Sequence, residues 1–178
     1  MDTWDAVPAK TTVEQLLDAA GAALAVADGV TVSGGEPFDQ PEALERLLVG
    51  IRSRSKVDIL VFSGYVLERL SALLTRLDGL IDCIVTDPFD ALIPQTLALR
   101  GSDNQRIVCL TDLGRARFSS FDRKLQPTDR VLDILFDDET GEVFLAGIPR
   151  PGDMRRLVRL LAEDSHVAVT TEGKAPLR

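Results

Sequence analysis

One carboxylate directly follows two glycines in the segment VTVSGGEPFDQPE, which contains Gly34, Gly35 and Glu36. Glycine lets the backbone adopt conformations closed to other residues and lets a ligand approach closely. Backbone groups beside a carboxylate suit a cationic amino group better than a phosphate, and the lysine and glycine-rich turn of a phosphate-binding loop are missing. When the tetrapeptide SGGE is taken alone, a tight strand-to-loop turn with a solvated carboxylate is the favoured explanation.

Few other residues are of a type that could bind a metal or catalyse a reaction. The two cysteines, Cys83 and Cys109, make neither a disulfide framework nor a three-thiolate site by themselves. Both lie in apolar runs, so we expect them to be buried and to act as small hydrophobic side chains. His166 is the only histidine, which excludes a multi-histidine metal site. We therefore predict no metal site and assign no catalytic residue.

The composition and net charge of the chain limit the kinds of partner that it can bind. The chain has 178 residues, 45% of them hydrophobic and 27% charged, as expected for a globular protein with a core. Its net charge of −8 would repel a phosphate backbone, which argues against nucleic acid as a partner. No apolar run is long enough to cross a bilayer, and the first residues do not form a secretory signal. We expect no membrane association and a cytoplasmic location.

The elements that must position these residues alternate along the chain. A capping box of Thr11 and Glu14 opens a predicted helix over residues 13–27, and apolar spacing predicts two more helices, over 41–51 and 66–77. Between and after them lie four predicted strands, near residues 29–34, 57–63, 81–86 and 106–110. This order predicts an α/β fold in which the strands are parallel and the helices pack on one side of a curved sheet.

The character of the chain changes after residue 113. A long loop over residues 90–105 precedes the fourth strand, and a β-hairpin is predicted around Asp137–Gly141. A final helix begins at Asp153, and residues 166–171 read as a last strand. We therefore divide the chain into a core at residues 1–118 and an appendage of hairpin, helix and tail at residues 119–178.

Four segments, GVTVSGGEPFDQPEAL, VFSGY, IDCIVTDPFD and LRGSDNQRIVCL, occur in an order and spacing that resemble a known family. From about Thr3 to Leu113 the chain resembles radical S-adenosylmethionine (SAM) activating enzymes, particularly the anaerobic ribonucleotide reductase activase type and its single-cluster relatives. The resemblance implies an incomplete parallel β/α barrel. It also implies that the segment at Gly34, Gly35 and Glu36 contacts the amino group of SAM.

The same resemblance extends to other strand ends. Ser63 and Gly64 match a strand end that would line the cofactor pocket, although a strand-terminating turn explains them almost as well. The pair Thr86–Asp87 departs from the family pattern, so no role is carried onto it. Asn104 and Gln105 match a characteristic dipeptide and are interpreted as hydrogen-bonding anchors of the loop rather than as catalysts.

Radical SAM chemistry needs a [4Fe–4S] cluster held by cysteine thiolates in the pattern Cys-x3-Cys-x2-Cys, and this sequence does not contain that pattern. The N-terminal residues resemble the segment that follows the third cluster cysteine. We therefore expect either that Met1 is internal to a longer reading frame or that the chain is a natural derivative without a cluster. As the sequence stands, it lacks the ligands for reductive cleavage of SAM.

Three functions remain open. The first is an activase-like radical SAM enzyme that abstracts a hydrogen atom through a 5′-deoxyadenosyl radical when the cluster is present. Its partners would be a glycyl-radical enzyme, or another peptide or small-molecule substrate, and an external electron donor. The second is a catalytically inert module of the same fold that binds SAM or a partner, and the third is one part of a split enzyme.

The strand near residues 29–34 would lose a neighbour if the chain begins after the cluster loop. A bare strand edge is prone to association, because its N–H and C=O groups seek a partner. We expect either self-association through this edge or an exposed apolar flank near Val30 and Val32.

Overall fold

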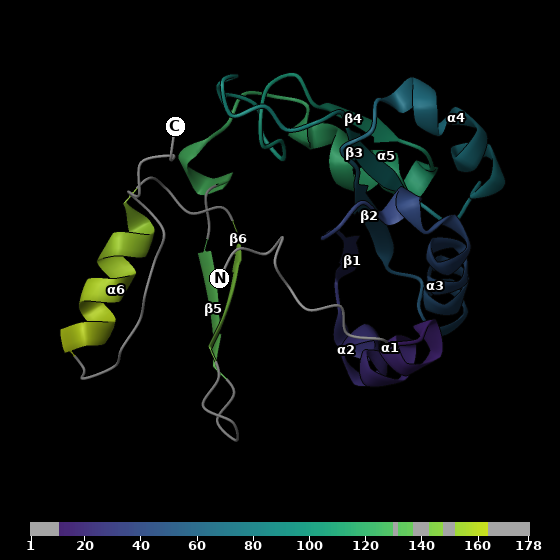
Figure 1. The fold of residues 1–178 in the computed structure, drawn as a ribbon, viewed down its shortest axis with the longest axis horizontal. Coiled ribbons are helices and arrows are strands. Elements are labelled where there is room, and N and C mark those ends of the chain that lie inside the picture. The colour runs from purple at the N-terminus through teal and green to yellow at the C-terminus, as the bar shows by residue number, and fades with distance from the viewer. Residues whose placement is uncertain (1–10, 130–131, 137–142, 148–151, 164–178) are drawn as a thin grey trace. The chain divides into compact units, whose positions relative to one another are not determined.

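The computed structural model describes residues 11–129, 132–136, 143–147 and 152–163 (Figure 1). The chain divides into two compact units, Met1–Lys124 and Leu125–Arg178, and each is described by itself. The domain boundary predicted after residue 118 stays a prediction. Among the described residues, no helix is long and apolar enough to cross a membrane.

A four-stranded sheet forms the centre of the first unit. Its strands stand in the order β1 (Gly29–Val32), β2 (Asp58–Phe62), β3 (Cys83–Thr86) and β4 (Arg106–Cys109). The α/β class is thereby confirmed. The predicted barrel is not shown, because the described strands make an open sheet with β1 and β4 at its edges.

The direction of β4 was predicted wrongly. β1, β2 and β3 are parallel, as predicted, but β4 runs antiparallel to β3. A parallel neighbour needs a crossover, usually a helix, that returns the chain to the opposite end of the sheet. Residues 88–105, which include the loop predicted over 90–105, contain no helix, so the chain re-enters the sheet at the end where it left.

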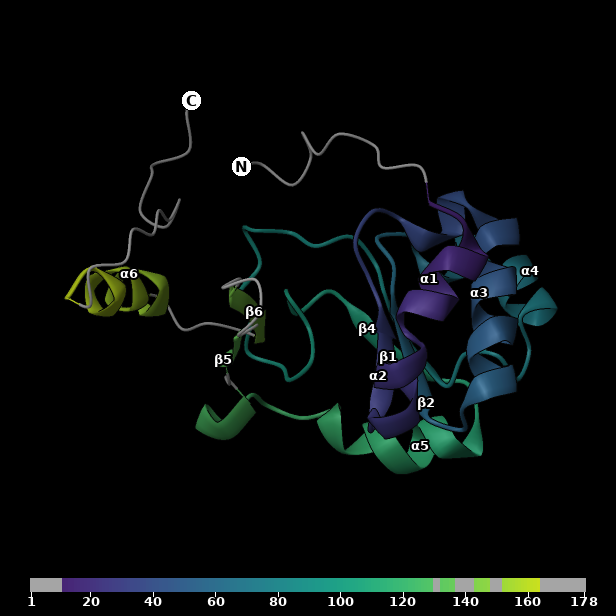
Figure 2. The ribbon, with the colours of Figure 1, turned by 90° about the horizontal axis from the view of Figure 1, so that it is seen from below.

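Four helices cover one face of the sheet (Figure 2). They are α1 (Val13–Ala19), α2 (Gly21–Val26), α3 (Pro41–Arg54) and α4 (Leu67–Arg76). The predicted first helix is in fact two, and its capping box is formed by Thr12 and Gln15 rather than by Thr11 and Glu14. The core between these helices and the sheet contains Leu48, Leu70 and, from the strands, Ile59, Val61 and Ile84, all buried.

The opposite face has its own small core. Leu60, Cys83 and Val85 are buried there against Leu99, Ile107 and Phe118. Phe118 ends α5 (Asp112–Phe118), a helix that the sequence analysis did not predict. The prediction that the helices pack on one side therefore holds for the first four helices and not for α5.

The edge of β1 is only partly covered. Val30 and Val32 are half-buried, and together with Leu16, which is 46% exposed, they line a hollow of about 260 Å³ between β1 and the helices. Both valines also pack against the core on the helix side, so the exposed apolar flank that was predicted near them stays a prediction. Self-association through this edge stays a prediction.

Asp82, which is only 2% exposed, fixes the amino ends of the strands. One carboxylate oxygen accepts from the Arg52 guanidinium of α3 and from the backbone N–H of Ile59, and the other accepts from the Thr111 hydroxyl that caps α5. The carbonyl of Asp82 accepts from Leu110 N–H. One buried residue thus joins α3, β2, the start of β3, the end of β4 and α5.

The second unit contains a β-hairpin and a helix. β5 (Leu132–Phe136) and β6 (Val143–Gly147) pair antiparallel, which confirms the predicted hairpin, and α6 (Asp153–Glu163) begins at Asp153 as predicted. The turn around Asp137–Gly141 and the strand predicted at residues 166–171 lie outside the described residues.

Replacement of Asp82 tests its role as the link between elements. Asp82→Ala leaves the largely buried Arg52 guanidinium without its counter-charge, and we expect a loss of about 3–5 kcal/mol in the free energy of unfolding. Urea unfolding followed by circular dichroism measures it. Asp18→Ala removes the carboxylate of an exposed ion pair with Arg54 and should change the stability by less than about 1 kcal/mol. Equal losses in the two variants would contradict the assignment.

The close packing of α5 against the start of β3 leads to a second prediction. A Cβ at Gly114 would lie 1.9 Å from the Asp82 carbonyl oxygen, whereas a Cβ at Gly21 in α2 would meet nothing within 4 Å. We expect Gly114→Ala to destabilise the chain by about 1–3 kcal/mol or more, because backbone must move. The matched Gly21→Ala variant should be neutral or stabilise by about 0.5–1 kcal/mol. A neutral Gly114→Ala variant in urea unfolding would show that α5 does not pack there.

Candidate functional site

The carboxyl ends of β1 and β2 lie side by side, because the two strands are parallel and in register. The loop with Gly34, Gly35 and Glu36 leaves β1, and Ser63 and Gly64 follow β2. These five predicted site residues line one cleft of about 370 Å³. The structure therefore brings them together as predicted, and their binding of a cofactor stays a prediction.

Glu36 is held by three hydrogen bonds. One carboxylate oxygen, Oε1, accepts from Phe38 N–H at 3.1 Å and from the Ser63 hydroxyl at 2.8 Å, and Oε2 accepts from Gly64 N–H at 2.8 Å. All three donors are uncharged. A carboxylate has about four acceptor positions, so Oε2 retains one, and Glu36 lines the cleft. An ammonium group would find both a hydrogen-bond acceptor and a full negative charge there.

The local sequence explains the placement of this carboxylate. Glu36 is the N-cap of a short 3₁₀ helix, η2 (Pro37–Asp39), whose first residue is a proline. Gly34 has φ +122°, a backbone conformation that residues other than glycine rarely adopt. A Cβ at Gly34 or Gly35 would meet nothing within 4 Å. The space beside both glycines is thus open to a ligand.

Ser63 links Glu36 to the turn that follows β2. Its hydroxyl, in a residue only 5% exposed, donates to Glu36 and accepts from Tyr65 N–H at 3.1 Å. The Tyr65 hydroxyl donates to Asp39, which raises the pKa of Tyr65, and the Arg69 guanidinium lies 3.5 Å from the centre of the Tyr65 ring. The sequence analysis did not foresee the contact of Tyr65 with Asp39, because nothing in the spacing of these residues shows that they meet.

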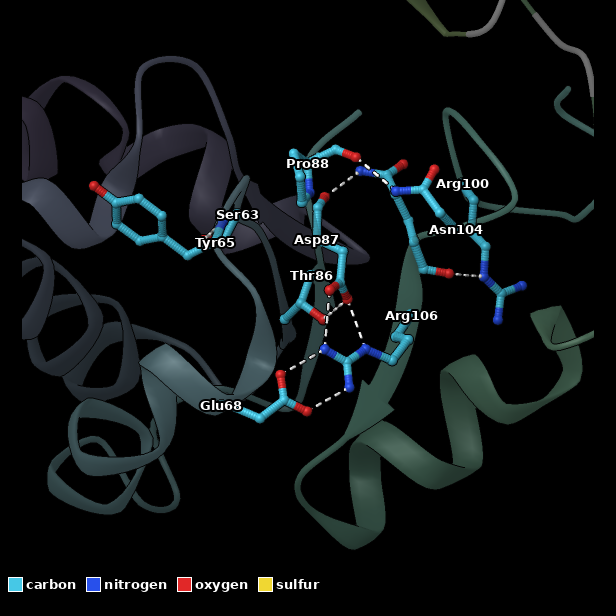
Figure 3. Close-up of polar contacts among 10 residues, drawn as sticks. Ser63, Tyr65, Glu68, Thr86, Asp87, Pro88, Arg100, Asn104 and Arg106 are labelled. Atoms are coloured by element: carbon cyan, nitrogen blue, oxygen red, sulfur yellow. Dashed lines mark hydrogen bonds and ion pairs between the residues drawn. The ribbon is translucent and has the colours of Figure 1, made fainter. Parts of the chain in front are cut away.

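A second group of polar side chains lies at the carboxyl end of β3 (Figure 3). Arg106 of β4 donates to both oxygens of Asp87 and to both oxygens of Glu68 in α4, at 2.7–2.9 Å. Hydrogen bonding to Arg106 lowers the pKa of Glu68 to about 2 and also lowers the pKa of Asp87. Asp87 has φ +77°. Since one guanidinium already hydrogen-bonds to the oxygens of both carboxylates and offsets half of their charge, they make a poor site for a further cation.

Asn104 and Gln105 anchor the loop, as the sequence analysis predicted. Asn104 donates to the Pro88 carbonyl at 2.8 Å, and Gln105 donates to the Asp87 carbonyl at 3.0 Å and accepts from Gly101 N–H at 2.7 Å. Gln105 also lines the cleft beside Glu36. That second position was not foreseen, because it depends on where the loop returns to the sheet.

The two cysteines do not fit a cluster site. Cys83 and Cys109 lie opposite each other on β3 and β4, with their sulfurs 4.0 Å apart, in the apolar core of the second face. Within the described residues, no three histidine, cysteine or carboxylate side chains gather closely enough to hold a metal ion. A [4Fe–4S] cluster bound by three cysteines therefore does not fit these residues.

The ion pairs of Arg106 predict a loss of stability in acid. Because the pKa of Glu68 is lowered from 4.5 to about 2 and that of Asp87 is also lowered, their contribution is complete above pH 4.5 and is lost as the pH falls toward 2. Urea unfolding at stepped pH should show this loss in the wild-type chain and a flatter profile in Arg106→Gln. Arg115→Gln, which breaks an exposed pair with Asp112, should keep the wild-type profile. An Arg106→Gln profile parallel to the wild type would contradict the prediction.

Comparisons with known proteins place the chain in a family. Searches of curated proteins and of solved structures find no match. A family model described as a 4Fe-4S single cluster domain matches residues 1–108, which include the whole sheet except its last residue, Cys109. The match is consistent with the resemblance to radical SAM and iron–sulfur proteins. The chain therefore belongs to the 4Fe-4S single cluster domain family.

Proposed function

We propose that this chain is a radical SAM-type protein and that the cleft beyond β1 and β2 binds SAM through its methionyl amino group. The observation that carries the proposal is the Glu36 carboxylate, which is held by three uncharged donors, keeps one acceptor position and lines the cleft. Membership of an iron–sulfur family supports the same cofactor class.

Each residue of the site has a separate task in this proposal. Glu36 accepts from the ammonium group and supplies its counter-charge, while the open backbone at Gly34 and Gly35 leaves room for the methionyl chain. Ser63 and Gly64 keep the carboxylate in one orientation by donating to its two oxygens. Preorganised donors of this kind reduce the cost of ordering the site when a ligand binds.

The finer assignment is activase-like chemistry on a glycyl-radical enzyme or another peptide, with an external electron donor. When present, a [4Fe–4S] cluster supplies the electron that cleaves SAM. Because the sequence has two cysteines and the cluster needs three, we derive no radical step from these residues. The cysteine count favours a second candidate, a module of the same family that binds SAM or a partner without radical chemistry.

Calorimetric titration of the purified chain with SAM tests the proposed contact. Hydrogen bonds to a charged group contribute about 1.5–3 kcal/mol, so Glu36→Gln should weaken binding about 10- to 150-fold. An analogue of SAM with hydrogen in place of the amino group should bind the wild-type chain with a similar loss. Because the variant and the analogue remove the same contact, their effects should not add.

The control is Glu42→Gln, which changes an exposed carboxylate of α3 that does not line the cleft. It should leave the affinity for SAM unchanged. The analogue also serves as an independent test on the unaltered chain if Glu36→Gln disturbs the loop. Equal binding of SAM and the analogue by the wild-type chain would refute ammonium recognition by Glu36.

A further inference from the structure

The two cysteines face each other directly across an antiparallel strand pair. The register places Cys83 of β3 opposite Cys109 of β4, and their Sγ atoms are 4.0 Å apart. These residues are distant in sequence, and each lies in its own apolar run. Only the antiparallel return of β4 brings the two thiols together, so the pair is a product of the tertiary fold.

The backbone geometry at this position suits a covalent link. The next pair in the ladder is joined by a hydrogen bond from Leu110 N–H to the Asp82 carbonyl, and narrow and wide pairs alternate in an antiparallel ladder. Cys83 and Cys109 therefore occupy a pair that is not hydrogen-bonded, where Cα atoms are about 4.5 Å apart. This separation falls within the range of about 4.4–6.8 Å that disulfides span.

The surroundings distinguish the two thiols. Cys83 is fully buried among Leu60, Val85 and other apolar side chains, and burial raises its pKa to about 12. Cys109 lies on the edge strand and is only half-buried. An oxidant from solution therefore meets Cys109 first, while Cys83 is the neighbour that can complete the bond.

We propose that Cys83 and Cys109 are a modification site, a dithiol that a small-molecule disulfide converts reversibly into an intramolecular disulfide. The Cys109 thiolate attacks one sulfur of the small disulfide, forms a mixed disulfide and releases one small thiolate. Cys83 then loses its proton and attacks the Cys109 sulfur, which expels the second small thiolate. Two protein thiols are oxidised, one small disulfide is reduced to two thiols, and β3 is joined covalently to β4.

The inference does not depend on SAM binding or on a cluster, because neither cysteine lines the cleft beside Glu36. A purely structural role for the pair, as two small hydrophobic side chains in contact, predicts no reaction in the folded chain. The two roles can therefore be separated by chemistry on the protein as it is.

The experiment treats the reduced, folded 178-residue chain with oxidised glutathione and follows intact mass and thiol content. We expect a monomer that lacks two hydrogens and both thiols, with the bond between residues 83 and 109 found by peptide mapping. The midpoint of urea unfolding should rise and should return to its starting value after dithiothreitol, because the link restricts the unfolded chain.

Matched variants fix the order of the two steps. Cys83→Ala should accumulate a stable glutathione adduct on Cys109, and Cys109→Ala should stay reduced, because Cys83 is buried. Three results on the wild-type chain would overturn the proposal: an adduct on Cys109 that does not close, two thiols that survive in the folded chain, or a bond that forms only in urea. Since all three are read on the wild-type chain, the proposal remains testable if a variant does not fold.

Discussion

The hydrogen bonds that the buried carboxylate of Asp82 accepts are the interactions on which the rest of the first unit depends. This carboxylate receives a guanidinium from α3, a backbone N–H from β2 and the hydroxyl that caps α5, and the carbonyl of Asp82 receives Leu110 N–H from the end of β4. A buried charge is tolerated only when it is paired and hydrogen-bonded, so these elements must meet at one point. Gly114 of α5 packs directly against the backbone of Asp82, which leaves α5 little freedom to shift.

A fixed amino end of the sheet has a consequence at the other end. Because β1, β2 and β3 are parallel and rigidly registered, the loops that leave them start from defined positions. Glu36 and Ser63 can therefore be joined across two strand ends by a 2.8 Å hydrogen bond. Ligands of parallel α/β folds bind beyond the carboxyl ends of the strands, where loops start from strand ends that the sheet holds in place.

The two polar groups at that end differ in how their charge is compensated. Asp87 and Glu68 share one guanidinium in a bidentate arrangement, which stabilises their ionised forms and ties α4 to β3 and β4. Glu36 receives three neutral donors and no charged one from the part of the chain that the structure describes. The carboxylate of Glu36 has no charged partner and lies beside an open cleft, whereas the one guanidinium of Arg106 offsets one of the two negative charges of Asp87 and Glu68 and occupies oxygens of both. This difference supports the proposal that a ligand binds beside the first strand pair, while the Arg106 cluster supports the structure at the end of the third strand.

The sequence by itself determined the local features. Apolar runs separated by amphipathic helices predicted four parallel strands, of which three are parallel, and the glycines before Glu36 predicted an open strand end. Gln105 was correctly interpreted as a loop anchor, because its amide bonds mostly to nearby backbone. Tertiary structure decided the rest: the antiparallel return of β4, the meeting of Arg106 with Glu68, and the contact of Cys83 with Cys109. These features arise from loop closure and packing between distant segments, and residue spacing along the chain carries no record of which segments become neighbours.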